Sequence, residues 1–347
     1  MPGIGIDTWL ALLAEKEGEM FEGKSVLITG GTGTFGQAAV RRLLDLEFPP
    51  ERVIIFSRDE FKQDRMHQAL GDEYGTDRAR LRFFLGDVRD RARLYHAFRG
   101  VDYVIHAAAM KQVPAAEYNP SEAIRTNIEG ALNVVDTAIA AGVTRVVALS
   151  TDKACAPVNL YGATKLCMEK VFQAAGAMAG SLNTRFAVTR YGNVSGSRGS
   201  VIPFFLEQHR RGHDVVPVTD PNCTRFWMQP ETAVDMVLQA LVTMEGGELI
   251  VPALRAYRVG DLVQVMDLDA KVVGLRPGEK RHETMVSEHE YEEFEHRGGF
   301  FVRPAGRAPD PAKRMKAPLA SDRTGRIGLE ELRYLVRALA IEKEPQP

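Results

Sequence analysis

The chain has 347 residues, of which 45% are hydrophobic and 26% are charged, and its formal net charge is -2. Such a balance is typical of a globular protein and argues against a surface that binds nucleic acid or anionic membranes. The three cysteines show no CxxC spacing and no apolar run is long enough to span a bilayer. We therefore expect a cytoplasmic protein with buried thiols, without a disulfide framework and without a metal site.

In chain order, the first predicted element is an amphipathic helix at 7–20, within an N-terminal extension covering 1–21. From residue 25 onward, short apolar runs alternate with helical patterns. The predicted strands cover 25–29, 52–56, 81–85, 103–106, 145–150 and 185–190, and the predicted helices cover 36–46, 60–70, 90–98, 120–141 and 160–178. Residues 22–190 are therefore predicted to form an α/β domain with a doubly wound parallel sheet of the Rossmann type.

After residue 190 this alternation stops. Residues 191–315 are predicted to form mostly a smaller substrate-binding lobe over the carboxyl ends of the strands, although a helical pattern at 231–245 is expected to return to the first domain. The tail 316–347 contains a predicted packing helix at 327–341, with leucines at 329, 332, 335 and 339.

A glycine-rich segment joins the first predicted strand to the first helix of this domain. Gly30, Gly33 and Gly36 have the spacing GxxGxxG, and Thr34 and Phe35 lie between the last two. Glycines in this context permit a tight turn and a close approach of the backbone to a pyrophosphate, which the helix N-terminus attracts. The five residues are predicted to bind a dinucleotide.

The end of the second predicted strand indicates which dinucleotide. NAD-binding proteins usually place a carboxylate here, whereas this chain has Ser57 and Arg58. A hydroxyl and a guanidinium suit a 2′-phosphate, so we expect NADP rather than NAD. The alternative is that Arg58 pairs with its neighbours Asp59 or Glu60.

Further contacts with the cofactor are expected after the third and fourth strands. Asp87 either accepts a hydrogen bond from the adenine amino group or caps a helix. Ala107 and Ala108 are small enough for the backbone to lie against the cofactor.

A tyrosine and a lysine follow the fifth strand. Tyr161 and Lys165 are four residues apart and therefore share one face of a helix. A tyrosine pKa of about 10 must fall by about 3 units for the side chain to act as a base near neutrality. An ammonium about 4 Å away in an effective dielectric of about 20 has an effect of that size. We therefore expect Lys165 to lower the pKa of Tyr161, and also to bind the cofactor.

Together these segments resemble the extended short-chain dehydrogenase/reductase family. Within it, the similarity is greatest to the soluble inverting UDP-N-acetylglucosamine 4,6-dehydratases of the pseudaminic acid pathway, a CapD-like group of polysaccharide biosynthesis proteins. The segments that carry it are TGGTGTFG, SRDEFKQDRM, AAAMKQVPAAEYNP, STDKACAPVNLYGATK, RYGNVSGSRGSVIPFF, TRFW and RPGEK.

The resemblance implies a reaction in three stages. Tyr161, assisted by Lys165 and Thr151, removes the proton of the sugar 4-hydroxyl while carbon 4 gives a hydride to NADP. Asp152 as acid and Lys153 as base then eliminate water across carbons 5 and 6, and the hydride returns to carbon 6. For Lys153 to act as a base, its pKa must fall through burial or nearby cations. Alternatively, these adjacent opposite charges are a simple surface pair.

Other functions remain open at this stage. A nucleotide-sugar 4-epimerase returns the hydride to carbon 4 and needs neither Asp152 nor Lys153. A 4,6-dehydratase of another nucleotide sugar is a further alternative. A non-catalytic NADP-sensing protein would be expected to lose Tyr161 or Lys165, and this chain keeps both.

Substrate contacts are also carried over from the resemblance. Asn193, Arg225 and Arg276 lie in RYGNV, TRFW and RPGEK and are expected to bind the nucleotide-sugar pyrophosphate, and Glu279 a ribose hydroxyl pair. Lys111 is expected either to touch the substrate or to be structural.

Two positions depart from the family pattern. Gln112 and Cys223 replace a common histidine and methionine, which leaves the sugar, the nucleotide and the stereochemistry at carbon 5 open.

The resemblance also bears on one further residue and on assembly. Asn127 resembles an asparagine that shapes the active site. The family usually assembles through the helices flanking the tyrosine, so we expect a homo-oligomer.

Overall fold

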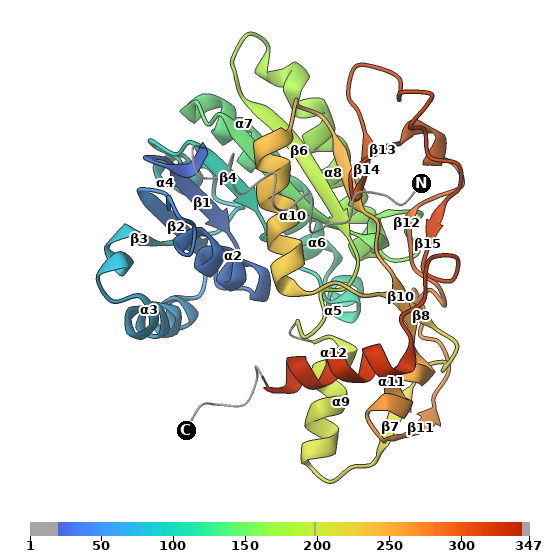
Figure 1. Cartoon of the computed structure of the whole chain (residues 1–347). Coiled ribbons are helices and arrows are strands. Elements are labelled where there is room, and N and C mark those ends of the chain that lie inside the picture. The colour runs from blue at the N-terminus through green and yellow to red at the C-terminus, as the bar shows by residue number, and fades with distance from the viewer. Residues whose placement is uncertain (1–19, 198, 342–347) are drawn as a thin grey trace.

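The computed structural model describes residues 20–197 and 199–341. Its centre is a nine-stranded sheet with the order β13-β14-β9-β6-β5-β4-β1-β2-β3 (Figure 1). Six of these strands were predicted, and all six are confirmed to within one residue: β1 (Ser25–Thr29), β2 (Arg52–Ser57), β3 (Leu81–Leu85), β4 (Tyr103–His106), β5 (Arg145–Thr151) and β6 (Arg185–Tyr191). They pair in parallel, as a doubly wound sheet requires.

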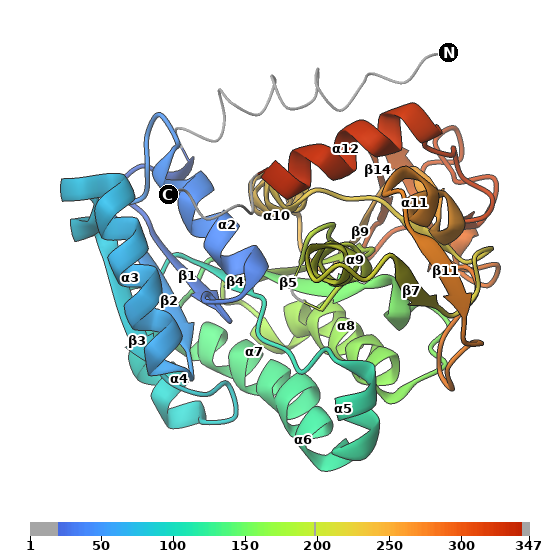
Figure 2. The same cartoon turned by 90° about the horizontal axis from the view of Figure 1, so that it is seen from below.

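Helices cover both faces of this sheet (Figure 2). On one face α2 (Thr34–Leu44) packs against α10 (Pro230–Thr243). On the other face α7 (Gly130–Ala141) packs between α4 (Arg91–Ala97) and α8 (Leu160–Ala179), while α3 (Glu60–Tyr74) and the 3-10 helix η1 (Gly75–Arg80) connect β2 to β3. The predicted helix 120–141 is interrupted: α6 (Pro120–Ile124) is followed by the π-helix η2 (Arg125–Glu129) and only then by α7.

The sheet continues beyond the predicted strands. β9 (Leu249–Pro252) adds in parallel to β6, and β14 (Phe300–Arg303) and β13 (Glu295–Arg297) extend it antiparallel. All three come from the range 191–315, which we had assigned mostly to a second lobe. β13 contains no apolar residue, and β9 and β14 lie after the point where the regular alternation of strands and helices, by which the equally short β4 was recognised, stops. This explains why the three strands were missed.

A second hydrophobic cluster lies beside the main core. It is formed by residues such as Phe205, Trp227 and Leu262, and by Leu332 and Val336 of the C-terminal helix. The elements around it are α9 (Val201–Arg210), β7 (Val215–Val218), β8 (Thr224–Phe226), β10 (Ala256–Arg258), α11 (Val259–Val265), β11 (Asp269–Val272) and α12 (Leu329–Ile341). The division of the chain into two lobes and its assembly into a homo-oligomer stay predictions.

Some expectations lie outside the described residues or are wrong in detail. The predicted helix at 7–20 falls, apart from Met20, outside the residues that the structure describes. Cys155 and Cys223 are buried free thiols, but Cys167, which we also expected to be buried, is exposed on α8. Among the described helices, none has both the length and the apolar character needed to cross a bilayer.

A buried guanidinium connects the sheet with the C-terminal half of the chain. Arg190 of β6 is 1% exposed and donates to both carboxylate oxygens of Glu169 on α8, at 2.9 and 2.7 Å. It also donates to Glu290 at 2.8 Å and to the carbonyl oxygen of Met285 in β12 (Thr284–Val286) at 2.8 Å. Glu169 in turn accepts a hydrogen bond from Ser150 at the end of β5.

Replacement of Arg190 by methionine is expected to lower the free energy of unfolding by about 3 to 5 kcal/mol, because Glu169 would stay buried, and Glu290 partly buried, without this cation. Urea unfolding measures this loss. The matched control is Arg41→Met, which breaks an ion pair with Glu73 whose side chains are 35% and 42% exposed. That variant should lose about 1 kcal/mol or less. Equal losses in both variants would contradict the importance of the buried pair.

Candidate active site

The glycine loop has the close contacts expected of a dinucleotide site. Gly33 is the N-cap of α2 and no side chain caps this end, so the positive end of the helix dipole, which attracts anions, lies at the glycine loop. A Cβ on Gly36 would lie 2.4 Å from the carbonyl oxygen of Gly31, and one on Gly30 would lie 2.9 Å from the backbone of Ala108. Helix, loop and the end of β4 therefore approach more closely than any larger residue allows.

The other residues predicted for the cofactor surround this loop. Thr34 and Phe35 form the first turn of α2 and are half-buried, as are Ala107 and Ala108 after β4. Ala107 and Ala108 donate their N–H groups to the carbonyl and the hydroxyl oxygen of Thr29, both at 3.2 Å. The structure thus places the two alanines directly beside the glycine loop.

Ser57 and Arg58 end β2 at the same edge of the sheet. Arg58 has a 60% exposed side chain that lies 3.6 Å from Asp87, and it pairs with neither Asp59 nor Glu60. Asp59 instead caps α3 by accepting from the N–H of Lys62. The hydroxyl oxygen of Ser57 accepts a hydrogen bond from Gln63, so its own proton is still available to a ligand.

Asp87 is not a helix cap. The N-cap of α4 is Asp90, so that alternative for Asp87 is wrong. The carboxylate of Asp87 accepts from the guanidinium of Arg89 at 2.6 and 2.9 Å. Burial raises the pKa of Asp87, but Arg89 and Arg58 outweigh it, so the pKa is lowered overall.

Asn127 lies on the π-helix and connects two segments of the site. Its side chain exchanges two hydrogen bonds with the backbone of Met110, at 2.8 and 3.0 Å, and donates to Thr164 on α8 at 3.0 Å. Single π-helical turns are frequent at functional sites. Here the turn directs a buried amide toward both the loop after β4 and the helix that carries Tyr161.

The predicted chemical residues converge where β5 ends. Thr151 is the last residue of β5, Asp152 and Lys153 belong to the 3-10 helix η3 (Asp152–Ala154), and Tyr161 and Lys165 lie on α8. All are buried except Lys153, whose side chain is 21% exposed. The structure therefore brings together the five residues proposed from sequence.

The pKa of Tyr161 differs from our expectation. Burial raises it to about 12, while the ammonium of Lys153 and a hydrogen bond with Thr151 lower it. The expected fall is therefore wrong for this structure, because burial disfavours the charged phenolate, and the cation that opposes this effect is Lys153 rather than Lys165. Burial lowers the pKa of Lys165 to about 8, against the attraction of Glu169.

Asp152 and Lys153 form a partly buried ion pair. Lys153 Nζ donates to Asp152 Oδ1 at 3.0 Å and to Asn193 Oδ1 at 3.2 Å, and lies 3.5 Å from Glu283 Oε1. Burial alone would lower the pKa of Lys153, but the carboxylates of Asp152 and Glu283 together have the larger, opposite effect. The pKa is therefore raised overall. The two residues are thus not a solvated surface pair, and the surrounding carboxylates favour the ammonium form of Lys153, contrary to the lowered pKa that we expected for a base.

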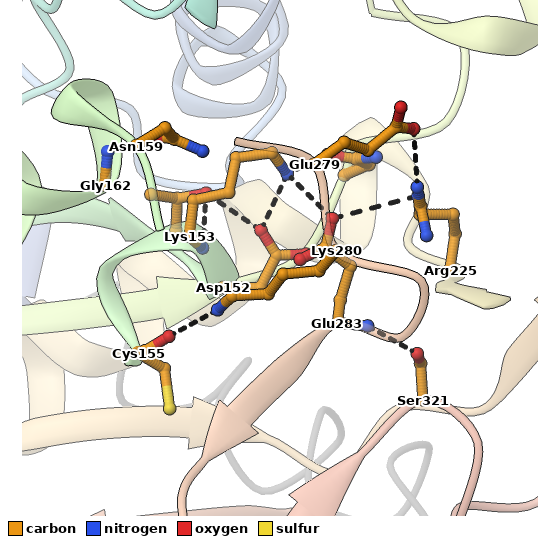
Figure 3. Close-up of polar contacts among 12 residues, drawn as sticks. Asp152, Lys153, Cys155, Asn159, Gly162, Arg225, Glu279, Lys280, Glu283 and Ser321 are labelled. Carbon is orange, nitrogen blue, oxygen red and sulfur yellow. Dashed lines mark hydrogen bonds and ion pairs between the residues drawn. The ribbon is translucent and has the colours of Figure 1, made fainter. Parts of the chain in front are cut away.

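The ion pair continues into a chain of alternating charges (Figure 3). Glu283 lies between Lys153 and Arg225, whose Nε is 3.8 Å away, and Arg225 donates to Glu279 at 3.0 Å. Arg225 is 8% exposed and is held by backbone carbonyl oxygens of Thr224 and Arg281. Glu283 was missed from the sequence, although it lies only four residues after Glu279.

The segment 276–283 is attached alongside the turn that carries Asp152 and Lys153. Asn159 donates to the carbonyl oxygen of Gly278 at 2.8 Å. Lys280 donates to the carbonyl oxygen of Cys155 at 2.6 Å (Figure 3). On α8, a Cβ on Gly162 would lie 2.1 Å from the carbonyl oxygen of Lys153. Only glycine fits at that position of α8.

Lys111 and Arg276 lie at the exposed border of the site. Partial burial of its ammonium and, to a smaller extent, the positive charge of Lys153 lower the pKa of Lys111. Arg276 is exposed, and its backbone N–H donates to Glu279 at 3.3 Å. Glu279 thereby joins the segments of Arg225 and Arg276.

Two curated relatives match much of the chain. A UDP-N-acetylglucosamine 4,6-dehydratase (inverting) of Campylobacter jejuni subsp. jejuni serotype O:23/36 (strain 81-176) is 51% identical over 270 residues, which cover 77% of this chain and 79% of the relative. A UDP-glucose 4-epimerase of Rickettsia akari (strain Hartford) is 40% identical over 338 residues, which cover 92% and 97%.

A solved structure and a family model complete the comparison. The X-ray structure of Pen from Bacillus thuringiensis is 37% identical, covers 92% of this chain and 99% of its own, and superposes with a TM-score of 0.85. The family model of the polysaccharide biosynthesis proteins matches residues 26–304, the range that contains the glycine loop, the Asp152–Lys153 pair and the Arg225 cluster. The chain therefore belongs to the polysaccharide biosynthesis protein family.

Proposed function

We propose that this protein is a 4,6-dehydratase of UDP-N-acetylglucosamine that inverts carbon 5 and uses a tightly bound NADP. The observation that carries the proposal is the buried Asp152–Lys153 pair beside Tyr161. It provides an acid and a base next to a redox centre, which elimination of water needs and epimerisation does not.

The residues around the glycine loop fit a nicotinamide dinucleotide. The N-terminus of α2 suits its pyrophosphate, and the tight contacts of Gly30 and Gly36 bring the backbone close to it. When bound, the cofactor supplies the oxidant that accepts the hydride of sugar carbon 4 and returns it to carbon 6. Arg58 and the free proton of Ser57 favour the 2′-phosphate of NADP over the ribose of NAD.

Tyr161 is the base for the sugar 4-hydroxyl. Its phenolate is favoured by the hydrogen bond with Thr151 and by the positive charge of Lys153. Lys165 is buried one helical turn away on the same helix face and adds a cation toward the cofactor side. Removal of the hydroxyl proton by Tyr161 completes the oxidation of carbon 4 to a ketone.

The ketone acidifies the proton on carbon 5, and the Asp152–Lys153 pair acts there. A proton shift along their 3.0 Å contact converts the charged pair into a neutral amine and a carboxylic acid. Displacement of water by the sugar favours this neutral form, because burial penalises charged groups. Lys153 then removes the carbon 5 proton, and Asp152 protonates the departing 6-hydroxyl, which leaves as water.

Arg225, Glu279 and Arg276 form the nucleotide end of the site. Arg225 is buried and oriented by backbone carbonyl oxygens, so its guanidinium is preorganised for a pyrophosphate. Asn193 holds Lys153 and lies between this end and the chemical centre. A 4-epimerase is the second candidate, since the Rickettsia akari relative matches a longer part of the chain.

Incubation with UDP-N-acetylglucosamine in heavy water distinguishes the two reactions. We expect a 4-keto-6-deoxy product that carries deuterium at carbon 5, because the enolate left by hydride return to carbon 6 takes up a solvent-derived proton at carbon 5. Inversion requires that this proton arrive on the face opposite to Lys153. NMR of the product detects both changes, and the configuration at carbon 5 of product made in ordinary water shows inversion or retention. A sugar altered only at carbon 4 would establish the epimerase instead.

Substitution of the pair tests its role in elimination. Asp152→Asn and Lys153→Met are each expected to lower kcat for dehydration by at least about 100-fold, since general acid–base groups typically contribute 10²–10⁴-fold. Cofactor binding, followed by fluorescence titration, should be unchanged because the glycine loop is separate from the pair. Undiminished product formation would show that the pair is only structural.

Arg58→Ala is expected to weaken NADP binding by about tenfold to 100-fold, the usual value of a hydrogen bond to a charged group, while NAD binding stays the same. Isothermal titration with both cofactors measures the two affinities. Arg41→Ala, an exposed arginine of α2 paired with Glu73, serves as the control and should change neither. Equal losses of NADP and NAD affinity in Arg58→Ala would refute the 2′-phosphate assignment.

A further inference from the structure

Glu283 occupies the centre of the charged chain, and sequence analysis gave it no role. Its side chain is 4% exposed, and its Oε1 lies 3.5 Å from Lys153 Nζ and 3.8 Å from Arg225 Nε. Its other oxygen, Oε2, is buried without a hydrogen-bond partner. A buried carboxylate with an unpaired oxygen is costly unless the site needs its charge.

The backbone holds this carboxylate in place. The N–H of Glu283 donates to Ser321 Oγ at 2.9 Å, and its carbonyl oxygen accepts from the N–H of Ser321 at 2.8 Å (Figure 3). Ser321 Oγ also lies 2.7 Å from the hydroxyl of Thr224, the residue before Arg225. Through Ser321, the strand pair β12–β15 (Leu319–Ala320) thus connects Glu283 with β8.

We propose that Glu283 is a positioning residue that holds the Lys153 ammonium and the Arg225 guanidinium on one carboxylate. It thereby sets the base of the elimination at a constant distance from the group that binds the anionic end of the substrate. This inference rests on the proposed function for the roles of Lys153 and Arg225. The contacts of Glu283 with Lys153 and Arg225 do not depend on the proposed function.

The charge of Glu283 also bears on when Lys153 releases its proton. Besides Glu283, the groups near Lys153 are Asp152 on its own turn and one residue from each of five other segments: Tyr161, Asn193, Arg225, Tyr257 and Lys111. Asp152 and Glu283 favour its charged form, while Arg225 and burial oppose it. Removal of the Glu283 charge therefore moves the titration of Lys153 to lower pH.

The test measures Lys153 directly. The rate at which acetic anhydride modifies Lys153 is followed by mass spectrometry as a function of pH, with exposed Lys271 as internal reference. Glu283→Gln is expected to move the midpoint for Lys153 down by about one pH unit or more, the usual effect of losing a close opposite charge. Well below both midpoints this means about tenfold faster labelling or more.

Glu279→Gln is the matched control, since it makes the same chemical change on the other side of Arg225. It should raise KM for the nucleotide sugar without moving the Lys153 midpoint. An unchanged midpoint in Glu283→Gln, or an equal shift in both variants, would overturn the proposal.

Glu283→Asp keeps the negative charge on a side chain that is shorter by one methylene group. This variant tests the inference if Glu283→Gln does not fold. It should retain a midpoint close to that of the wild type and lower kcat more than it changes KM, because the base is displaced. A wild-type kcat in this variant would overturn the positioning role. The labelling needs no turnover, so absence of dehydration by the wild type would refute the proposed function and leave the Glu283–Lys153 measurement intact.

Discussion

The guanidinium of Arg190 is the contact on which the geometry of the site depends. It lies near the end of β6, and its partners come from α8, which carries Tyr161 and Lys165, from β12 and from the segment that follows β12. Because buried carboxylates without a cation are strongly unfavourable, α8 and this segment cannot separate without a large cost in free energy. Glu283 lies immediately before β12, so the same contact also keeps the charged chain beside the catalytic helix.

Close backbone contacts also keep neighbouring segments of the site together, over shorter distances. Gly36 lets α2 lie against the loop that precedes it, and Gly162 lets α8 lie against the carbonyl oxygen of Lys153. In both places a methyl group would displace the helix from the residues it positions. The cofactor loop and the η3 turn are therefore each packed directly under the helix that follows them, which leaves little freedom for the side chains of Asp152 and Tyr161.

Lys153 belongs to both halves of the proposed reaction. Its charge favours the phenolate of Tyr161 during oxidation of carbon 4, and its neutral amine is the base for carbon 5. The proton shift to Asp152 separates these two roles in time. Because Lys153 is also held by Asn193 and Glu283, the order of the steps depends on residues from several distant parts of the chain.

The sequence by itself determined the six parallel strands, the glycine loop, and the grouping of Thr151, Asp152, Lys153, Tyr161 and Lys165. Each of these features depends on residues close together in the chain: a short apolar run, a glycine spacing, or two residues one helical turn apart. Only the tertiary structure decided that β9, β13 and β14 extend the sheet, that Asp90 rather than Asp87 caps α4, and that burial raises the pKa of Tyr161. It also decided the contacts of Arg190 and Glu283. The partners of Glu283 lie up to 130 residues away in the chain, and those of Arg190 up to 100 residues away. Ion pairs at such separations, and the burial that sets a pKa, depend on how the whole chain packs, and no local pattern of residues specifies them.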